Sequence, residues 1–186
     1  MKSLPQDAVL LIIDVQKGFD EPVWGNRNNT DAESQIEILL RAWRASGRPV
    51  YHAQHLSLMP NSPLRADNPG SAIKDAVQPV DGEPLFQKHV NSAFIGTELE
   101  ETLRANGHDT LVIVGLTTPH CVSTTTRMAG NYGFIVYLVE DAVAAFDLSA
   151  PDGTIIPAEE IHRVSLTALH GEFATVVSTE SVLAAL

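Results

Sequence analysis

Cys121 is the only cysteine of the 186-residue chain and the first candidate for chemistry. It follows a β-branched run at 110–114 and comes shortly after Thr118-Pro119. Threonine is a favoured N-cap and proline is common at the first helical position, so Cys121 is predicted in the first turn of a helix. Unpaired N–H groups and the helix dipole there favour the thiolate of a cysteine, whose ordinary pKa is about 8.5. A nucleophile fits this position, and so does a buried cysteine that packs as a small hydrophobe.

Asp14 and Lys88 are the other two candidates. Asp14 directly follows six apolar residues at 8–13, where its carboxylate could act as a base at a strand end or close an Asx-type turn. Lys88 comes after a proline-rich stretch, and the pattern of its neighbours by itself favours an exposed surface lysine.

An alternation of short apolar runs and helical patterns must position these residues. The run 8–13 lacks period-2 alternation, as expected for a strand buried on both faces. A helix is predicted from Thr30 or Asp31 to Gly47, because apolar residues recur there at i, i+3, i+4 and i+7. Further strands are predicted at 50–54, 110–114, 134–139 and 174–177, and further helices at 97–105, from 118, at 157–170 and at the C-terminus. This order predicts a parallel sheet with helices on both faces, and one α/β domain over residues 1–186.

In such a sheet the functional groups gather at the carboxyl ends of the strands. Asp14, the segment 115–121 and the pair 140–141 all follow predicted strands in this way. Within that pair, Asp141 is interpreted as a structural cap. Residues 56–84 contain five prolines and little regular pattern, a length typical of a binding loop or lid.

Composition limits the partners and the compartment. The chain carries 12 Lys+Arg against 23 Asp+Glu, a net charge of −11, which disfavours binding to nucleic acid or to an anionic membrane surface. One cysteine forms no internal disulfide and is typical of a reducing compartment. The run 8–13 is too short for a signal peptide or a membrane span. We therefore expect a cytoplasmic protein that binds neither nucleic acid nor a membrane.

Three motifs of the chain resemble, in the same order, those of the isochorismatase-like cysteine hydrolases. They are Leu11-Ile12-Ile13-Asp14-Val15-Gln16, Lys88 ahead of Ser92-Ala93-Phe94, and Val114-Gly115-Leu116-Thr117-Thr118-Pro119-His120-Cys121-Val122. Gly133-Phe134 followed by Glu140-Asp141-Ala142 and Phe146 is also similar, so the resemblance covers essentially the whole chain. It implies a three-layer α/β/α sandwich with a central, mainly parallel sheet. The activity it implies is hydrolysis of a C–N bond in a small amide, ureide or carbamoyl compound.

The resemblance also assigns roles to individual residues. Cys121 is implied to be the nucleophile, Asp14 the residue that takes its proton and later activates water, and Lys88 the cation that stabilises the thiolate. A cis peptide is implied between Leu116 and Thr117, with the backbone N–H groups of Thr117 and Cys121 forming the oxyanion hole. A thioester intermediate would divide amide hydrolysis into two easier steps.

A substrate pocket and an oligomer are further implications of the resemblance. Phe19 and Phe94 are its implied pocket walls, and Trp24 and His120 are added as candidates, since aromatic side chains often line small-molecule sites. Each of the three aromatic residues also fits a hydrophobic core. Family members are commonly homodimers or homotetramers, in which a neighbouring subunit can complete the pocket.

Two departures from the family narrow the function. Nicotinamidases carry an aspartate and two histidines after the second strand that bind a metal, and this spacing is missing here. His52 and His55 lie three apart on a predicted strand and so on opposite faces, and we expect no metal and no cofactor. True isochorismatases, which cleave a vinyl ether, lack the nucleophilic cysteine. The alternatives are such a vinyl-ether hydrolase and a non-catalytic binding protein on the same fold.

Overall fold

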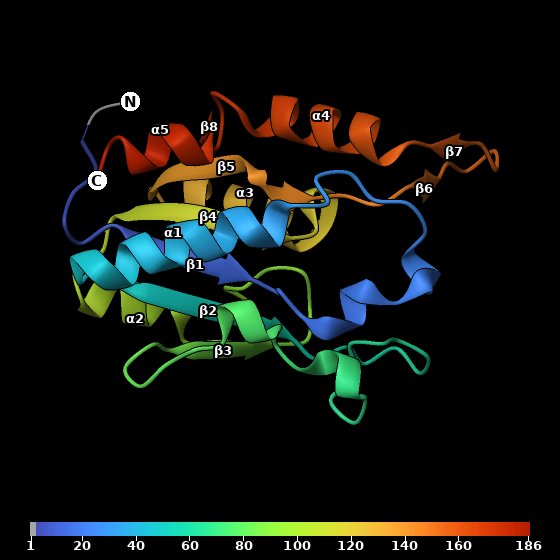
Figure 1. The fold of residues 1–186 in the computed structure, drawn as a ribbon, viewed down its shortest axis with the longest axis horizontal. Helices are drawn as coiled ribbons and strands as arrows, with labels where there is room; N and C mark the ends of the chain where they lie inside the picture. Colours follow the sequence, from blue (N-terminus) through green and yellow to red (C-terminus); the bar gives the residue numbers. More distant parts are fainter. Residues whose placement is uncertain (1–2) are drawn as a thin grey trace.

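The structure, a computed structural model, describes residues 3–186 and is built on a six-stranded sheet. The strand order is β3-β2-β1-β4-β5-β8 (Figure 1), and every neighbouring pair is parallel. The strands are β1 (Val9–Ile13), β2 (Val50–His55), β3 (Leu85–Lys88), β4 (Thr110–Leu116), β5 (Ile135–Ala144) and β8 (Thr175–Val177). The predicted parallel sheet is confirmed.

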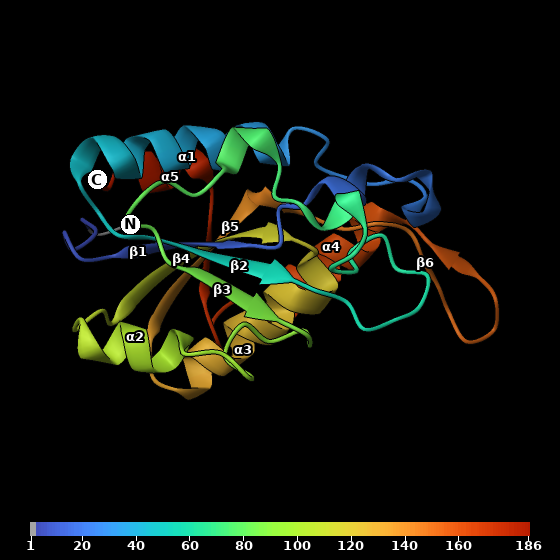
Figure 2. The same ribbon diagram turned by 90° about the horizontal axis from the view of Figure 1, so that it is seen from below.

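Helices cover both faces of this sheet (Figure 2). One face carries α1 (Ala32–Ser46) and α5 (Thr179–Leu183), and the other carries α2 (Leu99–Ala105), α3 (Ser123–Asn131) and α4 (Ala158–Leu169). A separate apolar cluster fills the space between the sheet and each helical layer. The chain therefore has the expected three-layer α/β/α architecture.

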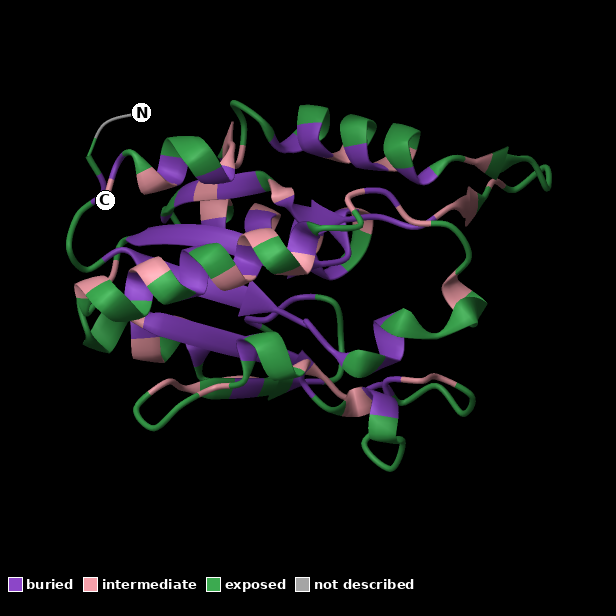
Figure 3. Ribbon diagram, viewed as in Figure 1, coloured by how far each residue is buried: buried purple, intermediate pink, exposed green. Residues whose placement is uncertain are grey.

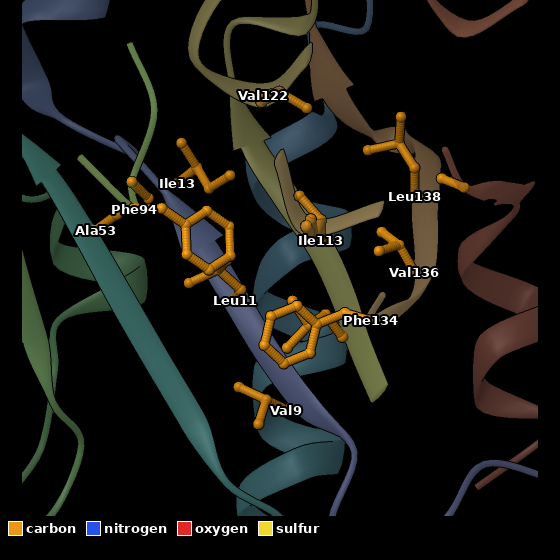
Figure 4. Close-up of a cluster of buried hydrophobic side chains, with 14 of the residues drawn as sticks. Val9, Leu11, Ile13, Ala53, Phe94, Ile113, Val122, Phe134, Val136 and Leu138 are labelled. Carbon is orange, nitrogen blue, oxygen red and sulfur yellow. The ribbon is translucent and has the colours of Figure 1, made fainter. Parts of the chain in front are cut away.

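The two central strands are continuously apolar because both of their faces are covered. Every residue of β1 and of β4 is buried, which Figure 3 shows as unbroken purple along the middle of the sheet. Figure 4 shows the cluster on the face that carries α2 and α3, where Leu11 of β1 and Ile113 of β4 lie near Phe134 and Val136. This packed layer fixes the positions of the strand ends.

Helix α1 confirms the apolar stripe and the glycine stop that its sequence predicted, but Asp31 at its N-cap makes no side-chain capping hydrogen bond. The apolar stripe ends at Trp43, which is fully buried and whose Nε1 donates a hydrogen bond to the carbonyl of Ala8 at 2.9 Å. Gly47 follows the helix with a left-handed φ of 67°, the usual conformation of a C-terminal glycine. The helix is thereby tied to the start of β1.

Three parts of the chain were not predicted. Strand β3 was not predicted because only every second one of its four residues is buried, and the last of these is a lysine, Lys88. β5 continues to Ala144, beyond its predicted end at 139, across an irregularity in its pairing with β4. An antiparallel hairpin forms from β6 (Leu148–Ser149) and β7 (Ile155–Ile156), each too short to leave a pattern.

The loops are shaped by short 3-10 turns. These turns are Lys17–Asp20, Pro22–Trp24, Pro69–Ser71 and Asp75–Val77. The last two lie in the 56–84 segment, which contains no other helix or strand, as its sequence predicted. Among residues 3–186, no helix is both long and apolar enough to cross a membrane.

The strand order reverses direction between β1 and β4, and this reversal places the carboxyl ends of both strands beside one crevice. Gly115 lets the two strands approach closely there. Its φ is 123°, and a Cβ on it would lie 2.0 Å from the carbonyl oxygen of Ile13. The residues after Ile13 and Gly115 are therefore held next to one another.

Candidate active site

Asp14 and Lys88 form a buried ion pair at this crevice. Asp14 follows the last residue of β1, and Lys88 is the last residue of β3, two strands away. The Nζ of Lys88 donates to Oδ2 of Asp14 at 2.6 Å, and both side chains are fully buried. Lys88 is therefore not the exposed surface lysine that its sequence pattern favoured. Although Lys88 lies on an edge strand, its side chain is buried because it pairs with the carboxylate of Asp14, 74 residues away in the sequence.

Asp14 presents its second carboxylate oxygen without a partner. Its backbone has a left-handed φ of 51°, and its N–H donates to the carbonyl of Ala53. Among the described residues, no hydrogen bond reaches its buried Oδ1. Burial raises the pKa of this carboxyl group above its ordinary value, although the charge of Lys88 acts in the opposite direction. A carboxylate with one free oxygen and a raised pKa is suited to accept a proton.

Cys121 supplies a hydrogen that Asp14 could accept. A carboxylate oxygen of Asp14, a ring nitrogen of His55 and Sγ of Cys121 all lie within 4.8 Å of one another. Sγ also lies 3.9 Å from Oδ1 of Asn91, a contact in which the thiol donates. The side chain of Cys121 is buried in the cluster that includes Val122 and Ala129 of the same face. The thiol of Cys121 thus lies near the carboxylate of Asp14 and contacts the side-chain amide of Asn91.

The thiol is less acidic than its place in the sequence suggested. Residues Thr118–Val122 form a π-helical turn, and α3 begins only at Ser123, so Cys121 precedes the regular helix. The N–H groups of its neighbours His120 and Val122 both donate to the carbonyl of Thr117. Burial raises the pKa of Cys121 to about 12; the charge of Asp14 raises it too, whereas that of Lys88 lowers it. Burial of the thiol therefore opposes the thiolate that its position at a helix start favoured.

The turn that carries Cys121 is anchored from both sides. The peptide bond between Leu116 and Thr117 is cis, at the position that the resemblance implied. Oγ1 of Thr117 lies 3.1 Å from Nδ1 of His120, and Oγ1 of Thr118 lies 3.0 Å from Nδ1 of His162 in α4. The oxyanion hole at the N–H groups of Thr117 and Cys121 stays a prediction.

The implied pocket residues fall into two groups. Phe19 stacks with Phe146 at a centroid distance of 6.2 Å, and the ring of Trp24 is tilted against both, 5.1 Å from Phe19 and 5.8 Å from Phe146. This aromatic cluster packs with Leu116, next to the turn that carries Cys121. Phe94 lies elsewhere, in the core cluster of Figure 4, where it packs on Tyr132 and Phe134.

His120 and Asp141 can also be placed. His120 is exposed in the middle of the turn Thr118–Val122, where it remains a candidate for contact with a substrate. Oδ1 of Asp141 accepts hydrogen bonds from both the N–H and the Oγ1 of Thr179, the first residue of α5. Asp141 therefore acts as the structural cap that the sequence indicated.

The two histidines of β2 point to different neighbours. His52 pairs with Glu83 at 2.9 Å, whereas Nδ1 of His55 lies 3.3 Å from Nζ of Lys88. The predicted opposite faces are confirmed. Asp14, His55 and Cys121 have donor atoms of the kinds that bind metals, but the ammonium of Lys88 already lies against the first two. The group does not fit a metal ion while that charge is in place.

His55 and Asn91 were missed as site residues. The sequence offers His55 only as a metal-ligand candidate, because the register that sets it opposite Lys88 in β3 cannot be read from the sequence. Asn91 lies between Lys88 and the Ser92-Ala93-Phe94 motif. Its position directly next to that motif is the sequence signal that could have identified it as a site residue.

The six-stranded parallel sheet with helices on both faces and a buried polar group at its reversal point defines a three-layer α/β/α protein of the isochorismatase-like type. The sequence model of the isochorismatase domain matches residues 8–181, and the chain belongs to this family of hydrolases.

Known relatives agree with this assignment. The chain is 49% identical over 180 residues to the uncharacterized isochorismatase family protein YrdC of Bacillus subtilis, covering 97% of this chain and 96% of that protein. A crystal structure of an isochorismatase-family protein from Chromobacterium violaceum matches with a TM-score of 0.95 and 45% identity, over 100% of this chain and 96% of the other. An N-carbamoylsarcosine amidase of an Arthrobacter species is 31% identical over 165 residues, which are 80% of this chain and 58% of that protein.

Proposed function

We propose that this hydrolase uses Cys121 to cleave a C–N bond of a small amide, ureide or carbamoyl compound through a thioester intermediate. The observation that carries the proposal is a carboxylate oxygen of Asp14 within 4.8 Å of Sγ of Cys121, with Oδ2 of this carboxylate bound to Lys88 and its Oδ1 without a hydrogen-bond partner. A relative named N-carbamoylsarcosine amidase supports hydrolysis of a C–N bond.

The first half-reaction follows from the protonation states. With a thiol pKa of about 12, Cys121 is protonated at neutral pH, so its proton must leave while the C–S bond forms. Oδ1 of Asp14 takes this proton, and the substrate carbonyl becomes an oxyanion that is bound by the predicted oxyanion hole, the N–H groups of Thr117 and Cys121. When the oxyanion collapses, the C–N bond breaks and Asp14 returns the proton to the departing nitrogen. The products are the free amine and an acyl-thioester on Cys121.

The second half-reaction uses the same carboxylate. Asp14 takes a proton from water, the hydroxyl oxygen attacks the thioester carbonyl, and the C–S bond breaks. The proton held by Asp14 then returns to Sγ, and the acid leaves. The positive charge of Lys88 keeps Asp14 ionised between these steps, because desolvation alone would favour the neutral acid.

The test is hydrolysis of a panel of small amides, ureides and carbamoyl compounds by the wild type and by Cys121→Ala. We expect release of the amine by the wild type, an acyl adduct in its intact mass under rapid quench, and neither in the variant. EDTA is expected to leave the rate unchanged. Full turnover by a folded Cys121→Ala protein would refute a covalent role for the thiol.

A further inference from the structure

The ammonium group of Lys88 has three hydrogens and three acceptors. Besides Oδ2 of Asp14 at 2.6 Å, Nζ lies 3.2 Å from the carbonyl oxygen of Val90 and 3.3 Å from Nδ1 of His55. An ammonium has no lone pair, so His55 must accept at Nδ1 and carry its own ring hydrogen on Nε2. Every N–H of Lys88 is thus directed to a protein acceptor.

His55 is itself held in place by a buried glutamine. The Nε2 of Gln16 donates to the carbonyl of His55 at 2.9 Å, and Oε1 of Gln16 accepts from the N–H of His55 at 2.9 Å. The same Nε2 also donates to the carbonyl of Ser71 at 2.8 Å. Gln16 is fully buried, and its side chain pairs with the end of β2 as a neighbouring strand would. The backbone of His55 is therefore fixed on both sides.

The strand register then directs the imidazole to Lys88. His55 and Lys88 are partners in the parallel pairing of β2 with β3. Burial, together with the charges of Lys88 and of His89, lowers the pKa of His55 to about 4. The ring is neutral at pH 7, and a neutral ring is the form that can accept the hydrogen of Lys88.

We infer that His55 is a positioning residue, whose Nδ1 takes the third hydrogen of Lys88 and holds the ammonium against Asp14. This inference rests on the proposed function for its effect on rate, but not for its effect on Lys88. With these three acceptors around it, the ammonium of Lys88 is held in place by the protein. It acts as a fixed charge, and the direction of that charge depends on His55.

Two substitutions separate this role from packing. His55→Leu keeps a side chain of similar size but removes the acceptor. His55→Asn is the matched control, because its Oδ1 is attached to Cγ as Nδ1 is in histidine and can accept the same hydrogen. Thermal unfolding of both variants checks that the fold is kept.

The substrate-free readout is the ¹⁵N–¹H signal of the Lys88 ammonium. The chain has four lysines, and the loss of one signal in Lys88→Met assigns it. We expect a slowly exchanging Lys88 signal in the wild type and in His55→Asn, and hydrogen exchange at least tenfold faster in His55→Leu. An equally protected signal in His55→Leu, or no protected signal in the wild type, would overturn the inference.

The second readout is kinetic and applies once a substrate is known. For His55→Leu we expect kcat to fall about 10- to 100-fold with KM within twofold, and for His55→Asn kcat to recover to within about threefold of the wild type. Equal losses in both variants, with an unchanged Lys88 signal in both, would contradict the positioning role. If no amide is hydrolysed at all, the proposed function fails and the ammonium signal still decides the role of His55.

Discussion

The Lys88→Met variant tests how strongly the buried ion pair is coupled. At 2.6 Å, opposite charges attract by roughly 6 kcal/mol at an effective dielectric constant of about 20. Much of this attraction offsets the desolvation of the two ions, and removing one partner of a buried pair typically costs about 3–5 kcal/mol. We therefore expect Lys88→Met to lose about 3–5 kcal/mol of unfolding free energy at pH 8, where Asp14 would be left as an unpaired anion.

The pH dependence of that loss has a definite sign. Burial already raises the pKa of Asp14 above its unfolded value of 3.8, and without the charge of Lys88 this pKa rises further. A raised native pKa contributes stability that is present at low pH and is lost as pH rises through the native value. The stability of Lys88→Met should therefore approach that of the wild type as pH falls from 8 towards 5, because Asp14 takes up a proton.

Urea unfolding, followed by the fluorescence of the two tryptophans, measures these free energies at both pH values. The double variant Asp14→Asn/Lys88→Met is the control, since it removes both charges. We expect it to lose less than the sum of the single variants by at least about 2 kcal/mol. Additive losses, or a Lys88→Met loss that is the same at pH 5 and pH 8, would refute the reasoning.

Two other predictions concern the thiol and the close approach of the central strands. Because the pKa of Cys121 is raised to about 12, iodoacetamide should alkylate Cys121 more slowly than a model thiol at pH 7, and the rate should keep rising up to pH 10. Intact mass measures the alkylation, since the chain has a single cysteine, and fast labelling at pH 6 would contradict the prediction. Gly115→Ala should lower unfolding free energy by more than about 3 kcal/mol, because its Cβ would meet the carbonyl of Ile13 at 2.0 Å, and a melting temperature equal to that of the wild type would argue against this contact.

The sequence predicted the parts of the site that depend on local pattern. Asp14 and Cys121 were found because each follows a continuous apolar run, and such runs become central strands whose ends face a crevice. The helix that opens near Thr118 was also found. Its first turn is of the π type, however, and the pKa of the thiol is raised chiefly by its burial, and then by the charge of Asp14.

The sequence did not reveal the roles of residues that depend on contacts between distant parts of the chain. Lys88 was identified by motif resemblance alone, since a lysine in a short edge strand has the pattern of a surface residue until its carboxylate partner is known. The role of His55 depends on the β2–β3 register, and the core position of Phe94 depends on its packing against Phe134. None of these contacts lies within the span of a helix or strand pattern.

The place of Lys88 at the margin of the sheet bears on how the protein fails when heated. β3 is one of the two terminal strands of the sheet and is hydrogen-bonded to β2 alone, whereas β1 has a neighbour on each side. Terminal strands are drawn from the less protected part of a fold, and they open in partial unfolding events that leave the centre intact. Detachment of β3 removes the ammonium of Lys88 from Asp14, while Cys121 keeps its place in the turn that follows β4. Heat inactivation should therefore begin below the melting temperature, with loss of the charge pair as its first step and full recovery on cooling.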